Sequence, residues 1–104
     1  MKVNKKYVKS AEPFFKAMLK NPEVRFYYEQ EKAKSKIAMA VKTARLKACL
    51  TQAKLAEKIG TTQSVIARLE SGSDKRIPTL PFLAQIATAC HGSLEVGFSF
   101  KHAG

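Results

Sequence analysis

Apolar residues recur along the chain with a spacing that predicts helices over most of its length. Near the start, Phe14 and Met18 lie four positions apart, as residues do on one side of a helix. Phe15 and Leu19 repeat that spacing. Residues 1–10 are basic and are expected to form a frayed leader ahead of this amphipathic segment.

A second helical pattern begins at Asn21 and Pro22. Asparagine is a good capping residue, and proline is well tolerated in the first turn of a helix. From there to Ala48 neither glycine nor a further proline occurs, and one apolar stripe follows helical spacing: Ala33, Ile37, Ala40, Val41, Ala44 and Ala48. The pattern leaves two alternatives open, one long helix or two helices with a bend near Gln30.

Two short helices joined at Gly60 are predicted next, and a last helix is predicted from about Leu80 to Cys90. Glycine permits the left-handed backbone conformation that ends a helix sharply. Thr62, two residues later, stands where a capping residue for the second short helix belongs. The apolar residues of the two short helices share one face of each and are expected in the core: Leu55, Ala56, Ile59, Val65, Ile66 and Leu69.

The pattern changes to strict alternation in Ser93–Phe100, which predicts a half-buried β-strand. Its apolar positions are Leu94, Val96, Phe98 and Phe100. A lone strand leaves backbone groups unpaired and therefore needs a neighbour. The simplest neighbour is the same strand of a second copy, which predicts a homodimer held by a two-stranded ribbon. Lys2–Tyr7 is a weaker candidate for the neighbouring strand.

Composition narrows the class of partner. The chain has 104 residues, enough for one modest core, and a net charge of +11 that favours an anionic partner, either nucleic acid or a membrane surface. No apolar run is long enough to span a membrane, and the N-terminus does not resemble a secretory signal. Cys49 and Cys90 are far apart and in no metal-ligand spacing, so we expect reduced thiols, a cytoplasmic protein, no metal and no cofactor.

The second short helix carries a polar face opposite its apolar one. This polar face comprises Gln63, Ser64, Ala67, Arg68 and Ser71. Amide, hydroxyl, methyl and guanidinium groups are the chemistry that reads base edges in the major groove. An ordinary solvated helix face is the alternative interpretation, and we favour groove reading because of the pattern that surrounds it.

The segment Leu50–Gly72 resembles the Cro/C1-type (XRE) helix-turn-helix family, whose pattern is LTQxxLAxxxGxxxxxIxxxExG. The matching residues are Leu50, Thr51, Gln52, Leu55, Ala56, Gly60, Ile66, Glu70 and Gly72. The resemblance implies an all-α, Cro/C1 repressor-like fold with the DNA-binding domain at 31–92. Residues 1–30 would be an N-terminal helical extension, and residues 93–104 would hold the short dimerisation strand and a tail.

The same resemblance assigns roles to individual residues. Gln52 would contact a phosphate, Gln63, Ser64 and Arg68 would read bases, and Lys75 and Arg76 would meet the backbone or the minor groove. Thr62, Ala67 and Ser71 belong to the same expected DNA-binding surface. Arg45 and Glu70 would form a structural salt bridge. Two residues depart from the pattern: Cys49 and His91 stand where the family commonly has glycine, at a cost of up to about 1 kcal/mol for a helix end.

A looser resemblance covers most of the chain. A proline-started helix ahead of the helix-turn-helix and a C-terminal strand are similar to HigA-type antitoxins, which bind a small RelE/HigB-like toxin and repress their own operon. The apolar residues that would dock such a partner, or would instead pack within the homodimer, are Phe14, Phe15, Met18, Leu19, Phe26 and Tyr27. Residues 1–30 carry seven cations and three glutamates, a net charge of +4 that opposes a basic toxin.

The function predicted from the sequence is therefore a non-enzymatic repressor that binds a pseudo-palindromic operator in double-stranded DNA as a homodimer. An antitoxin of a HigBA/RelE-type pair is the favoured form. A stand-alone prophage-type repressor is the alternative. A small basic ribonuclease is disfavoured, because the sequence offers no credible acid/base pair.

Overall fold

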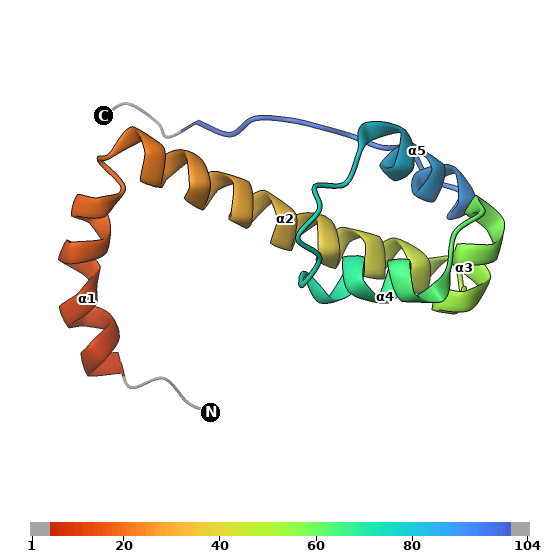
Figure 1. Cartoon of the computed structure of the whole chain (residues 1–104), viewed down its shortest axis with the longest axis horizontal. Helices are drawn as coiled ribbons and strands as arrows, with labels where there is room; N and C mark the ends of the chain where they lie inside the picture. Colours follow the sequence, from red (N-terminus) through yellow and green to blue (C-terminus); the bar gives the residue numbers. More distant parts are fainter. Residues whose placement is uncertain (1–4, 101–104) are drawn as a thin grey trace. The chain divides into compact units, whose positions relative to one another are not determined.

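The computed structural model describes residues 5–100, with side chains from residue 12 onward. Five helices follow one another in this range: α1 (Lys5–Met18), α2 (Pro22–Lys47), α3 (Gln52–Ile59), α4 (Gln63–Ser71) and α5 (Leu80–Ala89) (Figure 1). The chain divides into two units, one up to Lys36 and one from Ile37 onward, so the boundary falls inside α2. Of the helices described between residues 5 and 100, none is long and apolar enough to cross a membrane.

The first unit contains α1 and the beginning of α2. α1 starts at Lys5, so the expectation of a frayed leader is wrong from that residue onward, and residues 1–4 lie outside the described residues. Tyr7 and Ala11 continue the four-residue spacing of Phe15 and Leu19 toward the N-terminus, which explains why the helix extends that far. The weak strand candidate Lys2–Tyr7 is wrong for its described part, because Lys5–Tyr7 are helical.

α2 is one continuous helix of 26 residues, which decides between the two alternatives left by the pattern. The side-chain oxygen of Asn21 accepts a hydrogen bond of 2.9 Å from the backbone N–H of Glu23, as expected of a capping residue ahead of Pro22. The apolar stripe is partly wrong. Ala33 and Ala40 are exposed, whereas Ala38 is buried together with Val41.

The core of the second unit lies where α3 meets α4 and α5. Leu55 and Ile66 are completely buried at its centre, and the surrounding buried residues are Val41, Ala56, Leu69 and Ile86. Ile59 and Val65, predicted as core residues, are only half-buried at its edge. Apolar burial of this kind stabilises a fold by about 25 cal/mol per Å². The core therefore fixes α4 on α3, which is the arrangement that the apolar faces of the two short helices predict.

Threonines begin the three short helices. The side-chain oxygens of Thr51, Thr62 and Thr79 each accept a hydrogen bond from the backbone N–H three residues later, at 3.0, 3.3 and 3.3 Å. Each bond satisfies one of the donors that the first turn of a helix leaves unpaired.

Residues in the left-handed backbone conformation follow the ends of α2, α3 and α5. Gly60, with φ of 75°, ends α3, and the following Thr61 N–H donates to the carbonyl of Ala56 at 2.9 Å. Cys49 (φ 58°) and His91 (φ 61°) adopt the same conformation after α2 and α5 although both carry a Cβ. The two departures from the family pattern therefore stand at positions that favour glycine.

The segment 92–100 follows α5 without forming a strand, and no strand occurs elsewhere between residues 5 and 100. A strand requires a hydrogen-bonded neighbour, which a single copy of the chain does not supply here. Val96, Phe98 and Phe100 are each more than three-quarters exposed, whereas Leu94 is 38% exposed and lines a groove of about 430 Å³ between α2 and α5. The C-terminal dimerisation strand stays a prediction.

Candidate nucleic-acid interface

α3 and α4 form the helix-turn-helix, with Gly60 and Thr61 in the turn and Thr62 as the cap of α4. Ile66 and Leu69 bury one side of α4 against the core. The polar face lies on the other side: Gln63, Ser64, Arg68 and Ser71 are exposed, and Ala67 is half-buried. The structure therefore brings all five residues of the predicted polar face onto one exposed surface of a helix that the core holds in place.

Thr62 contributes to this surface from the start of α4. Its side-chain oxygen accepts a hydrogen bond of 3.3 Å from the backbone N–H of Val65. That bond does not use the hydroxyl hydrogen, which can therefore donate to a phosphate oxygen. The N-terminus of a helix also carries partial positive charge, which suits an anionic partner.

Arg45 and Glu70 form an ion pair that joins α2 to α4. Nε and Nη2 of Arg45 donate to the two carboxylate oxygens of Glu70 at 2.7 and 2.9 Å, which is bidentate geometry. Nη1 of Arg45 donates to the backbone carbonyl of Leu50 at 2.8 Å, just before α3 begins. The side chains of Arg45 and Glu70 are 10% and 4% exposed. One guanidinium thus fixes the start of α3 and the end of α4 relative to α2.

The pair also changes the titration of its members. Burial alone raises the pKa of the Glu70 carboxyl, but hydrogen bonds from Arg45 and Gln52 outweigh it and hold that pKa below its ordinary value. The same hydrogen bond to Glu70 raises the pKa of Arg45. The pair is therefore fully charged at neutral pH although water barely reaches it.

Gln52 has a contact that the sequence did not predict. Its side-chain N–H donates to the Glu70 carboxylate at 3.3 Å, from the first residue of α3. The residue is half-buried, and the second hydrogen of its amide group is not used by this bond. Gln52 is thus held at the start of α3 with a donor left for a phosphate, the contact that the family resemblance implies.

The segment between α4 and α5 carries the two remaining predicted residues. Lys75 and Arg76 are exposed, and Arg76 forms an ion pair with Asp74, with Nε 3.5 Å from Oδ1. Asp74 did not enter the sequence-based prediction. An aspartate in a polar loop commonly accepts a hydrogen bond from the backbone N–H two residues later, and this signal could have found it.

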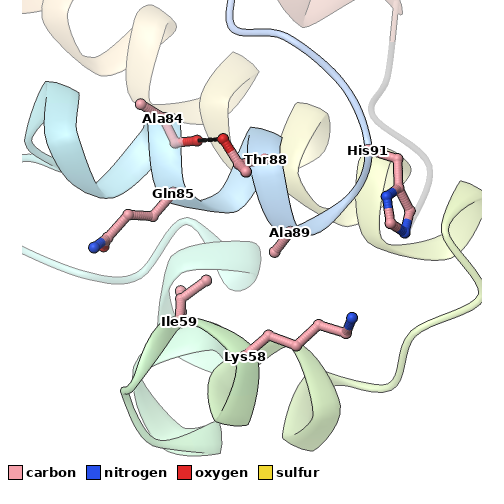
Figure 2. A pocket seen from close by; sticks show the side chains of 7 residues that line it. All are labelled: Lys58, Ile59, Ala84, Gln85, Thr88, Ala89 and His91. Atoms are coloured by element: carbon pink, nitrogen blue, oxygen red, sulfur yellow. Dashed lines mark hydrogen bonds between the residues drawn. The ribbon is translucent and has the colours of Figure 1, made fainter.

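A groove of about 550 Å³ lies between α3 and α5 (Figure 2). Ile59, Ala84 and Ala89 form its apolar part, and Lys58, Gln85, Thr88 and His91 line it with polar groups. The Thr88 hydroxyl donates to the carbonyl of Ala84 at 3.0 Å and is therefore paired within α5. None of the lining residues belongs to the predicted DNA-binding set, so the groove is separate from the polar face.

The first unit exposes several large apolar side chains. Phe14 and Phe26 are each 71% exposed, and Tyr27 is 64% exposed. Slightly more than half of the surface of Phe15 and of Met18 is covered, and Leu19 is half-buried. Phe15 meets Tyr28 edge-on, with ring centroids 5.4 Å apart, which joins α1 to the start of α2. Three of the six predicted docking residues are thus mostly uncovered in a single chain, and the other three are more than half covered.

Comparison with known proteins agrees with this geometry. A family model described as helix-turn-helix matches residues 41–96, which is more than half of the chain and includes α3, α4 and α5. No solved structure matches the chain.

Proposed function

Because this chain belongs to the Cro/C1-type (XRE) helix-turn-helix family and is a DNA-binding transcriptional regulator, we propose that it is a sequence-specific repressor. In this proposal a homodimer places α4 of each copy in successive major grooves of a pseudo-palindromic operator. The observation that carries it is the exposed polar face of α4, on a helix that is buried on its other side and fixed by the Arg45–Glu70 ion pair.

In this proposal the polar face of α4 reads the bases. Gln63 and Ser64 stand in the first turn of α4, the end that a recognition helix directs into the groove. Glutamine pairs with adenine and arginine with guanine through two hydrogen bonds, which gives Gln63 and Arg68 the greatest discriminating power. The methyl group of Ala67 can contact a thymine methyl, and Ser71 closes this surface at the end of the helix.

Affinity and register come from contacts with phosphates. Gln52 and Thr62 each begin a helix and have a donor available, and Lys75 and Arg76 add two cations in the loop after α4. The net charge of +11 attracts DNA in general and gives no sequence preference by itself. The proposal therefore predicts a strong salt dependence together with a preferred site.

Dimerisation is proposed through the segment Ser93–Phe100. Val96, Phe98 and Phe100 alternate with polar residues and are left exposed by a single copy. Pairing of this segment with itself would bury all three against the second copy, and the two-fold symmetry would match half-sites about 34 Å apart.

The proposal is tested by binding of the purified full-length chain to the DNA upstream of its own gene, measured by fluorescence anisotropy against a shuffled duplex of equal length. We expect binding at moderate salt that favours the upstream DNA at least about tenfold. Arg68→Ala should reduce that preference measurably, because the arginine reads one base in each half-site. Lys16→Ala removes the same charge in the first unit from an exposed side chain, and it should keep the preference. Equal affinity for both duplexes would contradict the proposal.

One observation favours a second role as an antitoxin. Six large apolar side chains of the first unit are at least one-third exposed in a single chain: Phe14, Phe15, Met18, Phe26, Tyr27 and Tyr28. Contiguous exposed apolar residues mark binding sites for other proteins. Co-expression with the neighbouring reading frame should yield a stable complex with a small partner that is toxic alone. Phe26→Ser should weaken that complex and leave DNA binding unchanged, whereas the absence of a partner would leave a stand-alone repressor.

A further inference from the structure

The loop between α4 and α5 contains an acidic residue at a place where DNA would repel it. Asp74 stands directly before Lys75 and Arg76, the two loop cations of the proposed DNA contact. A carboxylate beside phosphates costs free energy unless its charge is compensated within the protein. Its contacts indicate what it does there.

Asp74 is held almost entirely by Arg76. Its Oδ1 atom accepts a hydrogen bond from the backbone N–H of Arg76 at 3.0 Å and lies 3.5 Å from Nε of the same residue. The side chain of Asp74 is 18% exposed, whereas that of Arg76 is 70% exposed. The carboxylate is therefore turned into the loop and the guanidinium is presented outward, with one end attached to its partner.

The carboxylate also interacts with the recognition helix. The backbone N–H of Arg76 chiefly lowers the pKa of Asp74, and the positive charge of Arg68 on the polar face lowers it further. The first part of the loop is attached to α4 as well, because the Ser71 hydroxyl donates to the carbonyl of Arg68 at 2.9 Å and accepts from the N–H of Ser73 at 3.2 Å. Asp74 thus holds Arg76 in a loop whose first part is attached to the recognition helix.

We propose that Asp74 is a positioning residue for DNA binding, which holds the guanidinium of Arg76 in the orientation that meets a phosphate. The proposal rests on the proposed function. An exposed arginine samples many rotamers and loses conformational entropy when a phosphate fixes it. A guanidinium held at Nε keeps both terminal nitrogens available for the phosphate and loses less conformational entropy when it binds. Because the Arg76 guanidinium compensates the carboxylate, the proposal holds that the repulsion of the phosphate is weaker than this gain.

The test is a double-mutant cycle in full-length protein, with operator affinity measured over a range of salt concentrations. Arg76→Ala should lower the slope of log affinity against log salt by about 0.9, the contribution of one phosphate contact. Asp74→Ala should weaken binding about fivefold, the size of one lost hydrogen bond. In the Arg76→Ala background, Asp74→Ala should no longer weaken binding, because the residue it acts through is gone, and relief of the uncompensated repulsion should tighten binding slightly.

Two results would overturn the proposal. If Asp74→Ala tightens binding in both backgrounds, Asp74 acts only by repelling DNA. If it weakens binding equally in both backgrounds, Asp74 merely shapes the loop. Should the alanine variant melt at a lower temperature, Asp74→Asn replaces it, because the amide oxygen can still accept from the Arg76 N–H while the charge is lost. Failure of the wild-type protein to prefer any duplex would instead refute the proposed function.

Discussion

At the residue scale, the ends of α2 and α5 hold unusual backbone conformations. Cys49 and His91 are the non-glycine residues with positive φ among the residues described. The same pattern of two backbone hydrogen bonds closes the turn after each of these helices. After α2, one of the two is the 3.1 Å bond from the Leu50 N–H to the Arg45 carbonyl. A Cβ atom in this conformation is strained by about 1 kcal/mol. Glycine would remove that strain without changing a contact of the polar face.

Cys49→Gly is therefore expected to stabilise the protein by about 0.5–1 kcal/mol, measured by urea unfolding. Cys49→Ala removes the thiol but keeps the Cβ atom, so it should give no comparable gain. Gly60→Ala is the reverse case: an added Cβ would meet nothing within 4 Å, so its expected loss of about 1 kcal/mol comes from φ alone. A Cys49→Gly variant less stable than the wild type would show that the thiol makes a contact outweighing the strain.

At the element scale, the Arg45–Glu70 ion pair determines how α4 is presented. It joins α2 to α4, and the third bond of Arg45, to Leu50, fixes where α3 begins. Neither side chain has an alternative partner in solvent, because both are almost completely covered. Removal of one partner therefore leaves a buried charge unpaired, which costs more than the pair contributes as a whole.

Glu70→Gln should lower the free energy of unfolding by about 3 kcal/mol, because Arg45 would remain charged and poorly paired. Arg45→Met with Glu70→Leu removes both charges together and should cost much less than either single change. Urea unfolding of Glu70→Gln, of Arg45→Met and Glu70→Leu singly, and of the double variant measures this. Equal losses in the single and double variants would contradict a coupled pair.

The pair also predicts how stability depends on pH. The pKa of Glu70 is lower in the folded protein than in the unfolded chain, where it is about 4.3. The contribution of Glu70 to the stability of the fold is thus complete above about pH 4.3, and it is lost as the pH falls through the lower pKa that Glu70 has in the folded protein. Thermal melting between pH 3 and 7 should show a smaller acid loss for Glu70→Gln than for the wild type. An identical acid loss in both proteins would mean that Glu70 does not carry this dependence.

Short-range sequence patterns, which depend on residues a few positions apart, predicted the helices around the site. The Thr62 cap and Gly60 predicted where α3 ends and α4 begins, and the apolar spacing predicted most of the buried residues of these two helices, because each signal depends on neighbours along the chain. The buried side of α2 was predicted less well, with Ala38 in place of Ala40, because a pattern of alanines does not distinguish adjacent helix faces. The contacts of Gln52 and Asp74 were not predicted, because they depend on side-chain rotamers in three dimensions.

At the scale of the whole molecule, one copy leaves its C-terminal apolar residues uncovered. Phe98 and Phe100 are 87% and 86% exposed, and burial of such side chains in a dimer would be favourable by about 1.5–3 kcal/mol each. A repressor that reads a pseudo-palindrome needs two copies related by symmetry. The dimer and the DNA contact are therefore linked in this account.

Phe98→Glu should convert the dimer to monomers, measured by sedimentation equilibrium, and should lower operator affinity strongly. Ser99→Glu adds the same charge one position along, on the opposite side of an extended segment, and should leave the dimer intact. If both variants remain dimeric, the interface lies elsewhere. If both dissociate, the alternation between buried and exposed sides is refuted.

The most direct test of sequence-specific reading by α4 is selection of duplexes from a random-sequence library by the wild-type protein at moderate salt. The account predicts enrichment of one inverted repeat with half-site centres about 34 Å apart. Selection by the Arg68→Ala variant should lose the preference at one symmetric pair of positions and keep the rest. A wild-type pool with no enriched sequence, or an Arg68→Ala pool identical to it, would contradict the assignment of α4 as the recognition helix.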